Sequence, residues 1–98
     1  MHECESLDEV RANIDRIDER LVALLAERAR YVAQAARFKP TKAAVSDAGR
    51  LEAVIRRVRS LAEDHQTEPD LIEALYRALI AAYTAFERKV WVDEQEDR

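Results

Sequence analysis

The chain has 98 residues, of which 17 are Ala, two are Pro and only one is Gly. This composition favours long helices and disfavours a small β-barrel, whose tight turns need Gly, so we expect one all-α domain over residues 1–98. A net charge of −4 disfavours a general nucleic-acid-binding protein. No apolar run approaches the ~20 residues that cross a bilayer, and no secretory signal is present, so we expect a cytoplasmic protein.

The first predicted helix covers residues 7–38. Ser6, followed three residues later by Glu9, is typical of a capping box at its start, and Pro40 ends it. A helix of about 32 residues is ~48 Å long, which is longer than a compact domain of this mass is wide. We therefore expect a partner chain to cover its apolar face. That face is a heptad seam with alternating steps of three and four residues: Leu7, Val10, Ile14, Ile17, Leu21 and Leu24.

Two further helices follow. Ser46 and Asp47 are a good N-cap pair and predict a second helix over residues 48–63. Pro69 is favoured in the first turn of a helix and predicts a third helix over residues 69–92. The charged residues from Asp93 onward are expected to form a frayed tail.

Arg28 interrupts the apolar seam of the first helix. An unpaired charge buried there would cost several kcal/mol, so it needs an anionic partner. Lys39 lies eleven residues further on, within ~20° of the same helix face and ~16 Å away along the axis. The two cations could bind one ligand with two anionic ends. Alternatively, Arg28 pairs with an internal carboxylate and Lys39 is solvated at the helix end.

Glu87 places a charge of opposite sign on the apolar face of the third helix, beside Ile80 and Tyr83. Desolvation there would favour the protonated carboxyl, which could donate a hydrogen bond to a ligand oxygen. Glu87 could equally be the internal partner of Arg28 or Lys39. The spacing of these residues does not decide between the two interpretations.

Arg11 lies beside the seam, ~25 Å from Arg28 along the helix axis, so the two cannot share a site within one chain. An antiparallel two-fold partner could bring them together; otherwise Arg11 is a solvated flank of the seam. His2 and Cys4 are too few ligands for a metal site. The sequence contains no Gly-rich phosphate loop and no nucleophile elbow.

The segment of residues 10–28, VRANIDRIDERLVALLAER, closely resembles the all-helical (type II) chorismate mutase family. The family signature is an Arg, then Ile-Asp-x-x-Asp, then Leu-Leu-x-x-Arg, then a Lys eleven residues later, and Lys39 falls on that last position. Residues 31–39 and the connector at 43–45 look more like one branch, the isochorismate pyruvate lyases of salicylate-forming pathways. The resemblance extends over residues 7–91.

The resemblance implies an intertwined homodimer of three-helix chains with two equivalent sites and no cofactor. The substrate would be a small dianion, with Arg28 and Lys39 contacting its carboxylates and ether oxygen and Arg11 supplied by the partner chain. Glu87 would join Arg28 and Lys39 in catalysis. The resemblance also implies three further substrate-binding residues: Asp47, Arg50 and Thr84.

Two positions depart from the pattern of the mutases. The mutases usually have a Glu directly after the Arg of the second helix, whereas Leu51 follows Arg50 here, and the lyase branch likewise has an aliphatic residue. Most family members have Gln where this chain has Glu87, and a Glu can donate a hydrogen bond only when protonated.

We therefore expect an isochorismate pyruvate lyase that forms salicylate and pyruvate, with weak chorismate mutase activity at most. A chorismate mutase that forms prephenate is the close alternative, and an amino-substituted chorismate analogue is a third possible substrate. A non-catalytic helical dimer or regulatory module is the alternative from another class. The cations at Arg11, Arg28 and Lys39 argue against it, because an apolar seam needs no Arg.

Overall fold

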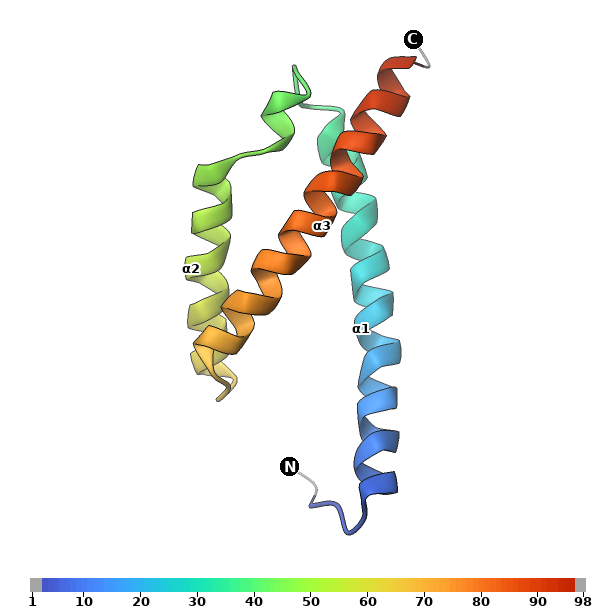
Figure 1. The fold of residues 1–98 in the computed structure, drawn as a ribbon, viewed down its shortest axis with the longest axis vertical. Coiled ribbons are helices and arrows are strands. Elements are labelled where there is room, and N and C mark those ends of the chain that lie inside the picture. The colour runs from blue at the N-terminus through green and yellow to red at the C-terminus, as the bar shows by residue number, and fades with distance from the viewer. Residues whose placement is uncertain (1–2, 97–98) are drawn as a thin grey trace. The chain divides into compact units, whose positions relative to one another are not determined.

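The structure is a computed structural model that describes residues 3–96. Within these residues the chain forms three α-helices, one short 3₁₀-helix and no strand (Figure 1). The all-α class and the order of three helices are confirmed. None of the helices in the described range is both long and apolar enough to cross a membrane. The elements are α1 (Leu7–Ala36), η1 (Ala43–Val45), α2 (Ala48–Asp64) and α3 (Pro69–Glu96).

The chain divides into two compact units, Met1–Tyr31 and Val32–Arg98. The first unit consists mainly of α1, and its start is capped as predicted. The Ser6 hydroxyl accepts a hydrogen bond from the Glu9 N–H at 3.1 Å, and the Glu9 carboxylate reaches back to accept the N–H of Glu5 at 3.1 Å. The first bond satisfies an N–H of the first turn, where N–H groups have no partner within the helix, and the second holds the chain just before the helix.

The apolar seam of α1 is exposed. Its six residues range from 38% exposed at Val10 to 61% at Leu7 and Leu24. None of residues 3–31 is buried. Contiguous apolar surface of this kind marks a site of interaction.

α1 ends at Ala36, two residues before the predicted end at Phe38. The N–H groups of residues 37–39 donate to carbonyls three residues earlier in the chain, at 3.0–3.2 Å. Pro40 disfavours the α conformation for the residue before it, so the last turn tightens into bonds of the 3₁₀ type. Lys39 therefore lies three residues beyond the end of α1, in the connector between α1 and η1.

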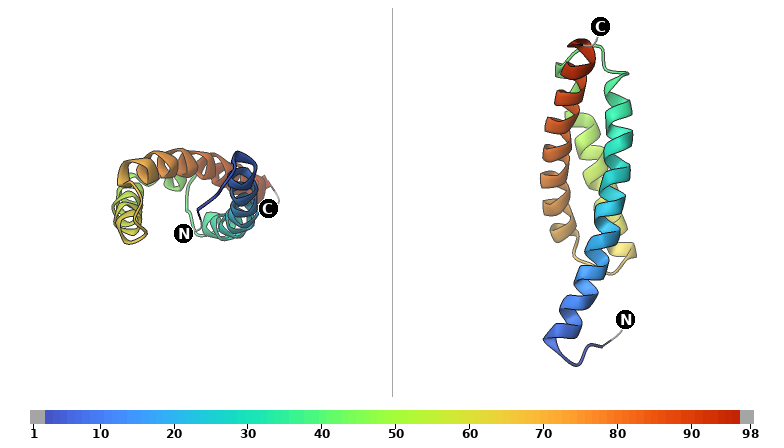
Figure 2. Two further views of the ribbon diagram at one scale, coloured as in Figure 1. Left: turned by 90° about the horizontal axis from the view of Figure 1, so that it is seen from below. Right: turned by 90° about the vertical axis from the view of Figure 1, so that its right-hand side faces the viewer.

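The second unit is built on a hairpin of α2 and α3, closed by the turn at residues 65–68 (Figure 1). α2 lies beside the N-terminal half of α3 (Figure 2). Asp47 caps α2 as predicted, since its Oδ1 accepts the Arg50 N–H at 3.0 Å. The hairpin buries one apolar face of α2, formed by Val54, Ile55, Val58 and Ala62.

α3 begins at Pro69 as predicted, but it continues to Glu96, four residues beyond the expected end. The expected frayed tail from Asp93 is therefore corrected for residues 93–96, which are helical. Glu94 in this segment pairs with Arg37 at 3.2 Å, a contact that holds the last turns of α3 against the chain after α1.

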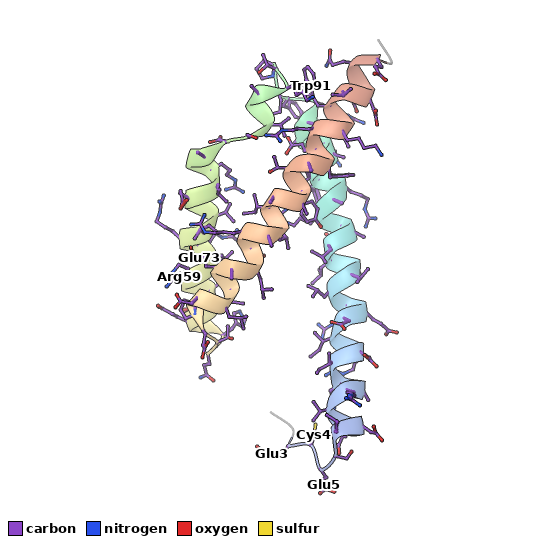
Figure 3. All side chains as sticks on the ribbon, in the orientation of Figure 1. Glu3, Cys4, Glu5, Arg59, Glu73 and Trp91 are labelled. Atoms are coloured by element: carbon purple, nitrogen blue, oxygen red, sulfur yellow. The ribbon has the colours of Figure 1, made fainter. Side chains whose placement is uncertain are left out.

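Five charged side chains join α2 to α3, and we call them the α2–α3 ion-pair network. Arg59 contacts Asp70 at 3.0 Å and Glu73 at 2.7 Å, and Figure 3 shows Arg59 and Glu73 directed toward each other. Arg77 contacts Glu73 at 2.8 Å and Glu52 at 3.3 Å. The hydrogen bonds from Arg77 and Arg59 lower the pKa of Glu73, so its carboxylate stays ionised between two guanidinium groups.

Candidate active site

Lys39 and Glu87 come together in the second unit. The Lys39 Nζ lies 3.5 Å from the Glu87 Oε2. Glu87 is 9% exposed and is the one buried charged residue in the described part of the chain. The arrangement matches one of the two interpretations that the sequence left open, in which Glu87 is the internal partner of Lys39.

The Glu87 carboxylate is not fully satisfied by this pairing. Its Oε2 is buried and accepts no hydrogen bond from residues 3–96, although the Lys39 ammonium is near enough for an ion pair. A buried acceptor without a hydrogen bond costs about 1–3 kcal/mol, and such groups in native proteins often mark functional positions. A hydrogen-bond donor on a ligand would satisfy it.

Trp91 also contacts Lys39, but at the backbone. Its indole Nε1–H donates to the Lys39 carbonyl oxygen at 3.0 Å. Trp91 was not among the predicted site residues. A signal for it was present, because it lies four residues after Glu87 on the same face of α3.

An open cavity of about 390 Å³ lies between the start of α2 and the middle of α3. Asp47 and Thr84, both predicted substrate-binding residues, line it together. Leu51, which occupies the position where the mutases usually have Glu, also lines it. The rest of the wall is formed by Ser46, Ala48, Arg77, Ile80, Ala81 and Arg88.

Two arginines of this wall were not predicted from the sequence. Arg77 is held in the α2–α3 ion-pair network, whereas Arg88 donates to the Ser46 hydroxyl beside the α2 N-cap. Both lie near Thr84 around the helix, at seven residues before it and four after it. That spacing was readable from the sequence once Thr84 had been selected.

The other three predicted cations are Arg50, Arg28 and Arg11. Arg50 is exposed and does not line the cavity; its backbone N–H is the group that Asp47 caps. Arg28 is half-buried and Arg11 is exposed, and both belong to the first unit. Their separation along the continuous helix α1 corresponds to ~25 Å, so a site that contains both within one chain is excluded.

The N-terminal segment gives no metal centre in the described residues. The Cys4 Sγ accepts a hydrogen bond from the Asn13 amide at 3.7 Å, and His2 lies outside the described residues. No cluster of three or more His, Cys, Asp or Glu side chains suited to a metal ion occurs within residues 3–96.

Comparison with known proteins agrees with the resemblance seen in the sequence. The family model for type II chorismate mutases matches residues 10–88. The chain belongs to the type II chorismate mutase family. This family member is 34% identical over 89 residues to the isochorismate pyruvate lyase of Pseudomonas aeruginosa, an alignment that covers 91% of this chain and 88% of that protein. The chain is thus an enzyme of the chorismate mutase kind, and every predicted site residue lies within the matched range.

Proposed function

We propose that the protein is an isochorismate pyruvate lyase that works as a cytoplasmic homodimer, one domain per chain. The observation that carries the proposal is Leu51 in the wall of the cavity, beside Asp47 and Thr84. A mutase of this family usually has a Glu at that position to contact the ring hydroxyl of chorismate, and an aliphatic side chain cannot make that contact. The similarity to a curated isochorismate pyruvate lyase supports the same choice.

The substrate carries two carboxylates and an enolpyruvyl ether. In the proposed mechanism Arg28, Lys39 and Arg11 of the partner chain bind these groups and fold the side chain over the ring. Fixed cations around a restricted conformer lower the barrier by orientation and by electrostatic preorganisation. Asp47, Arg50 and Thr84 provide the remaining contacts to the substrate.

Bond cleavage creates negative charge on the ether oxygen. Lys39 and a protonated Glu87 would stabilise this charge while a ring hydrogen passes to the enolpyruvyl carbon and the C–O bond breaks. Salicylate and pyruvate then leave. Atoms balance in this single pericyclic step, and all of its catalysis comes from side chains.

The ion pair in the free protein fits into this mechanism as its resting state. When the substrate ether takes the place of Glu87 at the Lys39 ammonium, Glu87 is left buried beside a dianion. Negative charge and burial both favour protonation of a carboxyl group. The proton turns the unsatisfied Oε2 into a donor for the ether oxygen.

A direct assay tests the proposed function. Purified protein is supplied separately with isochorismate and with chorismate, and salicylate fluorescence, pyruvate and prephenate are followed. We expect salicylate and pyruvate in equal amounts from isochorismate. Prephenate without salicylate would make the protein a chorismate mutase, and turnover of neither substrate would favour the non-catalytic dimer.

The role of Leu51 has its own test. Leu51→Glu should raise the ratio of prephenate to salicylate, because it restores the carboxylate that the mutases use. Leu51→Met changes the shape of the side chain without adding charge and serves as the control. A ratio that is the same in both variants would remove Leu51 as the determinant of the reaction.

The hydrogen-bond donor role of Glu87 is tested by substitution. We expect Glu87→Gln to keep salicylate formation, because its amide can donate to the ether oxygen, and Glu87→Ala to lose it. Glu94→Gln is the matched control, since Glu94 lies on the same helix and pairs with Arg37. Equal activity of the Gln and Ala variants at position 87 would contradict the donor role.

A further inference from the structure

We propose that Trp91 is a positioning residue that holds Lys39 in place for the reaction, an inference that rests on the proposed function of Lys39. The indole Nε1–H of Trp91 donates to the Lys39 carbonyl at 3.0 Å, and the bond is partly buried. Trp91 lies on the C-terminal part of α3 (Figure 3). The two residues are 52 positions apart in the sequence, so this bond joins the connector between α1 and η1 to α3.

Lys39 needs such an anchor because it lies outside regular structure. α1 has ended at Ala36, and η1 begins only at Ala43. The Lys39 N–H donates to the Ala36 carbonyl at 3.2 Å. Pro40, the next residue, has no N–H and cannot continue a hydrogen-bonded turn. The indole therefore fixes the carbonyl side of Lys39, while the preceding turn fixes its N–H side.

α3 contacts Lys39 at two places, its side-chain ammonium and its backbone carbonyl. Glu87 and Trp91 are four residues apart and so are neighbours on one helix face. Glu87 contacts the Lys39 ammonium, and Trp91 contacts the Lys39 carbonyl. When the substrate replaces Glu87 at the ammonium, the indole bond remains. It then determines where the base of the Lys39 side chain stands relative to the ether oxygen.

Two replacements remove the indole donor. Trp91→Phe removes the N–H and part of the ring. Since the chain has only one Trp, growth with β-(3-benzothienyl)alanine in place of tryptophan substitutes sulfur for N–H at this position alone and preserves the shape. We expect about a tenfold or greater loss of kcat in both proteins with little change in KM, because a misplaced catalytic group costs rate. The isosteric replacement keeps the test valid if Trp91→Phe does not fold.

A double-mutant cycle distinguishes positioning from general stability. If Trp91 acts through Lys39, Trp91→Phe should have no further effect on kcat in a Lys39→Ala background. If it acts through stability alone, the two losses should add. Additive losses, or a kcat unchanged by the isosteric replacement, would overturn the proposal.

A second readout does not depend on turnover. The chain has three lysines, Lys39, Lys42 and Lys89, so ¹³C-labelled lysine gives three ε-CH₂ signals, two of them internal controls. We expect the benzothienyl replacement to shift the Lys39 signal alone. If the wild-type protein turns over neither substrate, the proposed function fails, and this signal still decides whether Trp91 positions Lys39. An unmoved Lys39 signal overturns the proposal.

Discussion

The two units of the chain differ in how far their apolar side chains are buried. In the second unit, α2 and α3 bury a shared face that includes Ile55 and Val58, each under 5% exposed. In the first unit, the α1 seam has the same kind of residues at regular spacing, and all six are at least 38% exposed. The hairpin is stabilised within one chain, whereas the seam has the composition of a core without the burial of one.

The charges follow the same division. The second unit pairs its central charges internally, through Arg59, Glu73 and Arg77 and through Lys39 with Glu87. The proposed substrate-binding cations of the first unit lie ~25 Å apart on one helix. If a second chain covers the seam, the same association completes the site. Dimer formation would thus link the stability of the chain to its function, and substitutions in either unit test that link.

The largest expected effect comes from a charge in the seam. Ile17→Asp should abolish both dimer formation and turnover, because the carboxylate would be buried without a partner in the proposed interface. Val22→Asp is the matched control, since Val22 is 63% exposed and lies ~140° around the helix from Ile17. Sedimentation velocity and salicylate formation measure the two outcomes. A dimer that survives Ile17→Asp would show that the seam is not the interface.

The next effect concerns the cations of the first unit. Arg28→Ala and Arg11→Ala should each lower kcat by about 10²–10³-fold, the usual effect of removing one electrostatic contact to the transition state, while the proteins stay folded and dimeric. If Arg28→Ala instead unfolds the chain, Arg28 has a structural partner and not a substrate.

Mixing the two inactive variants tests the shared site. Random exchange of subunits makes half of the dimers mixed, and one site in each mixed dimer is free of both changes. About a quarter of the wild-type activity should therefore return. No recovery after demonstrated exchange would contradict a site that takes Arg11 from the partner chain.

The sequence predicted the helix starts well because caps are local. The Ser6 and Asp47 side chains each accept an N–H group three residues further on, and Pro69 fixes its own φ in the first turn of α3. Each lies where it was expected. The helix ends were less predictable. The end of α1 depends on how far the effect of Pro40 extends, and the end of α3 is held by a pair of residues 57 positions apart, Arg37 and Glu94.

The site shows the same limit. Periodicity selected Glu87 because it interrupts an apolar face, and it selected Lys39 because it lies eleven residues after Arg28 on one helix face. It did not decide whether Lys39 and Glu87 pair. That pairing depends on how α3 lies against the connector, which a helical pattern does not contain. Arg88 was missed for a different reason, since it sits on a mostly exposed face, where charges are common. Its contact with Ser46 arises only when η1 and α3 come together.

A core truncation tests the hairpin directly. Ile55→Ala should lower the free energy of unfolding by about 2–5 kcal/mol, as large-to-small changes at buried isoleucines do. Leu71→Ala is the control, because Leu71 is 50% exposed on α3 and should cost much less. Urea unfolding at one fixed protein concentration measures both, since the stability of a dimer depends on concentration. Equal losses would mean that Leu71 is covered in solution.

The smallest expected effect lies in the α2–α3 ion-pair network. Arg77 and Arg59 lower the pKa of Glu73, so folding is favoured by the ionised carboxylate. This contribution is fully present above the unfolded pKa of a glutamate, about 4.3, and is lost as pH falls through the lower native pKa. Glu73→Gln should therefore lower the melting temperature slightly at neutral pH and have no effect in strong acid. High salt should shrink the difference, because the network faces solvent.

Glu63→Gln provides the control for this prediction, since Glu63 is an exposed carboxylate on α2 outside the network. An equal decrease in melting temperature at neutral pH in the two variants would reflect net charge and not the contacts of Glu73. A loss specific to Glu73→Gln would show that the hairpin is joined by charge as well as by its apolar face. The six residues of the α1 seam are all uncharged. Salts that strengthen apolar burial should therefore strengthen association through the seam, whereas high salt weakens the ion-pair network.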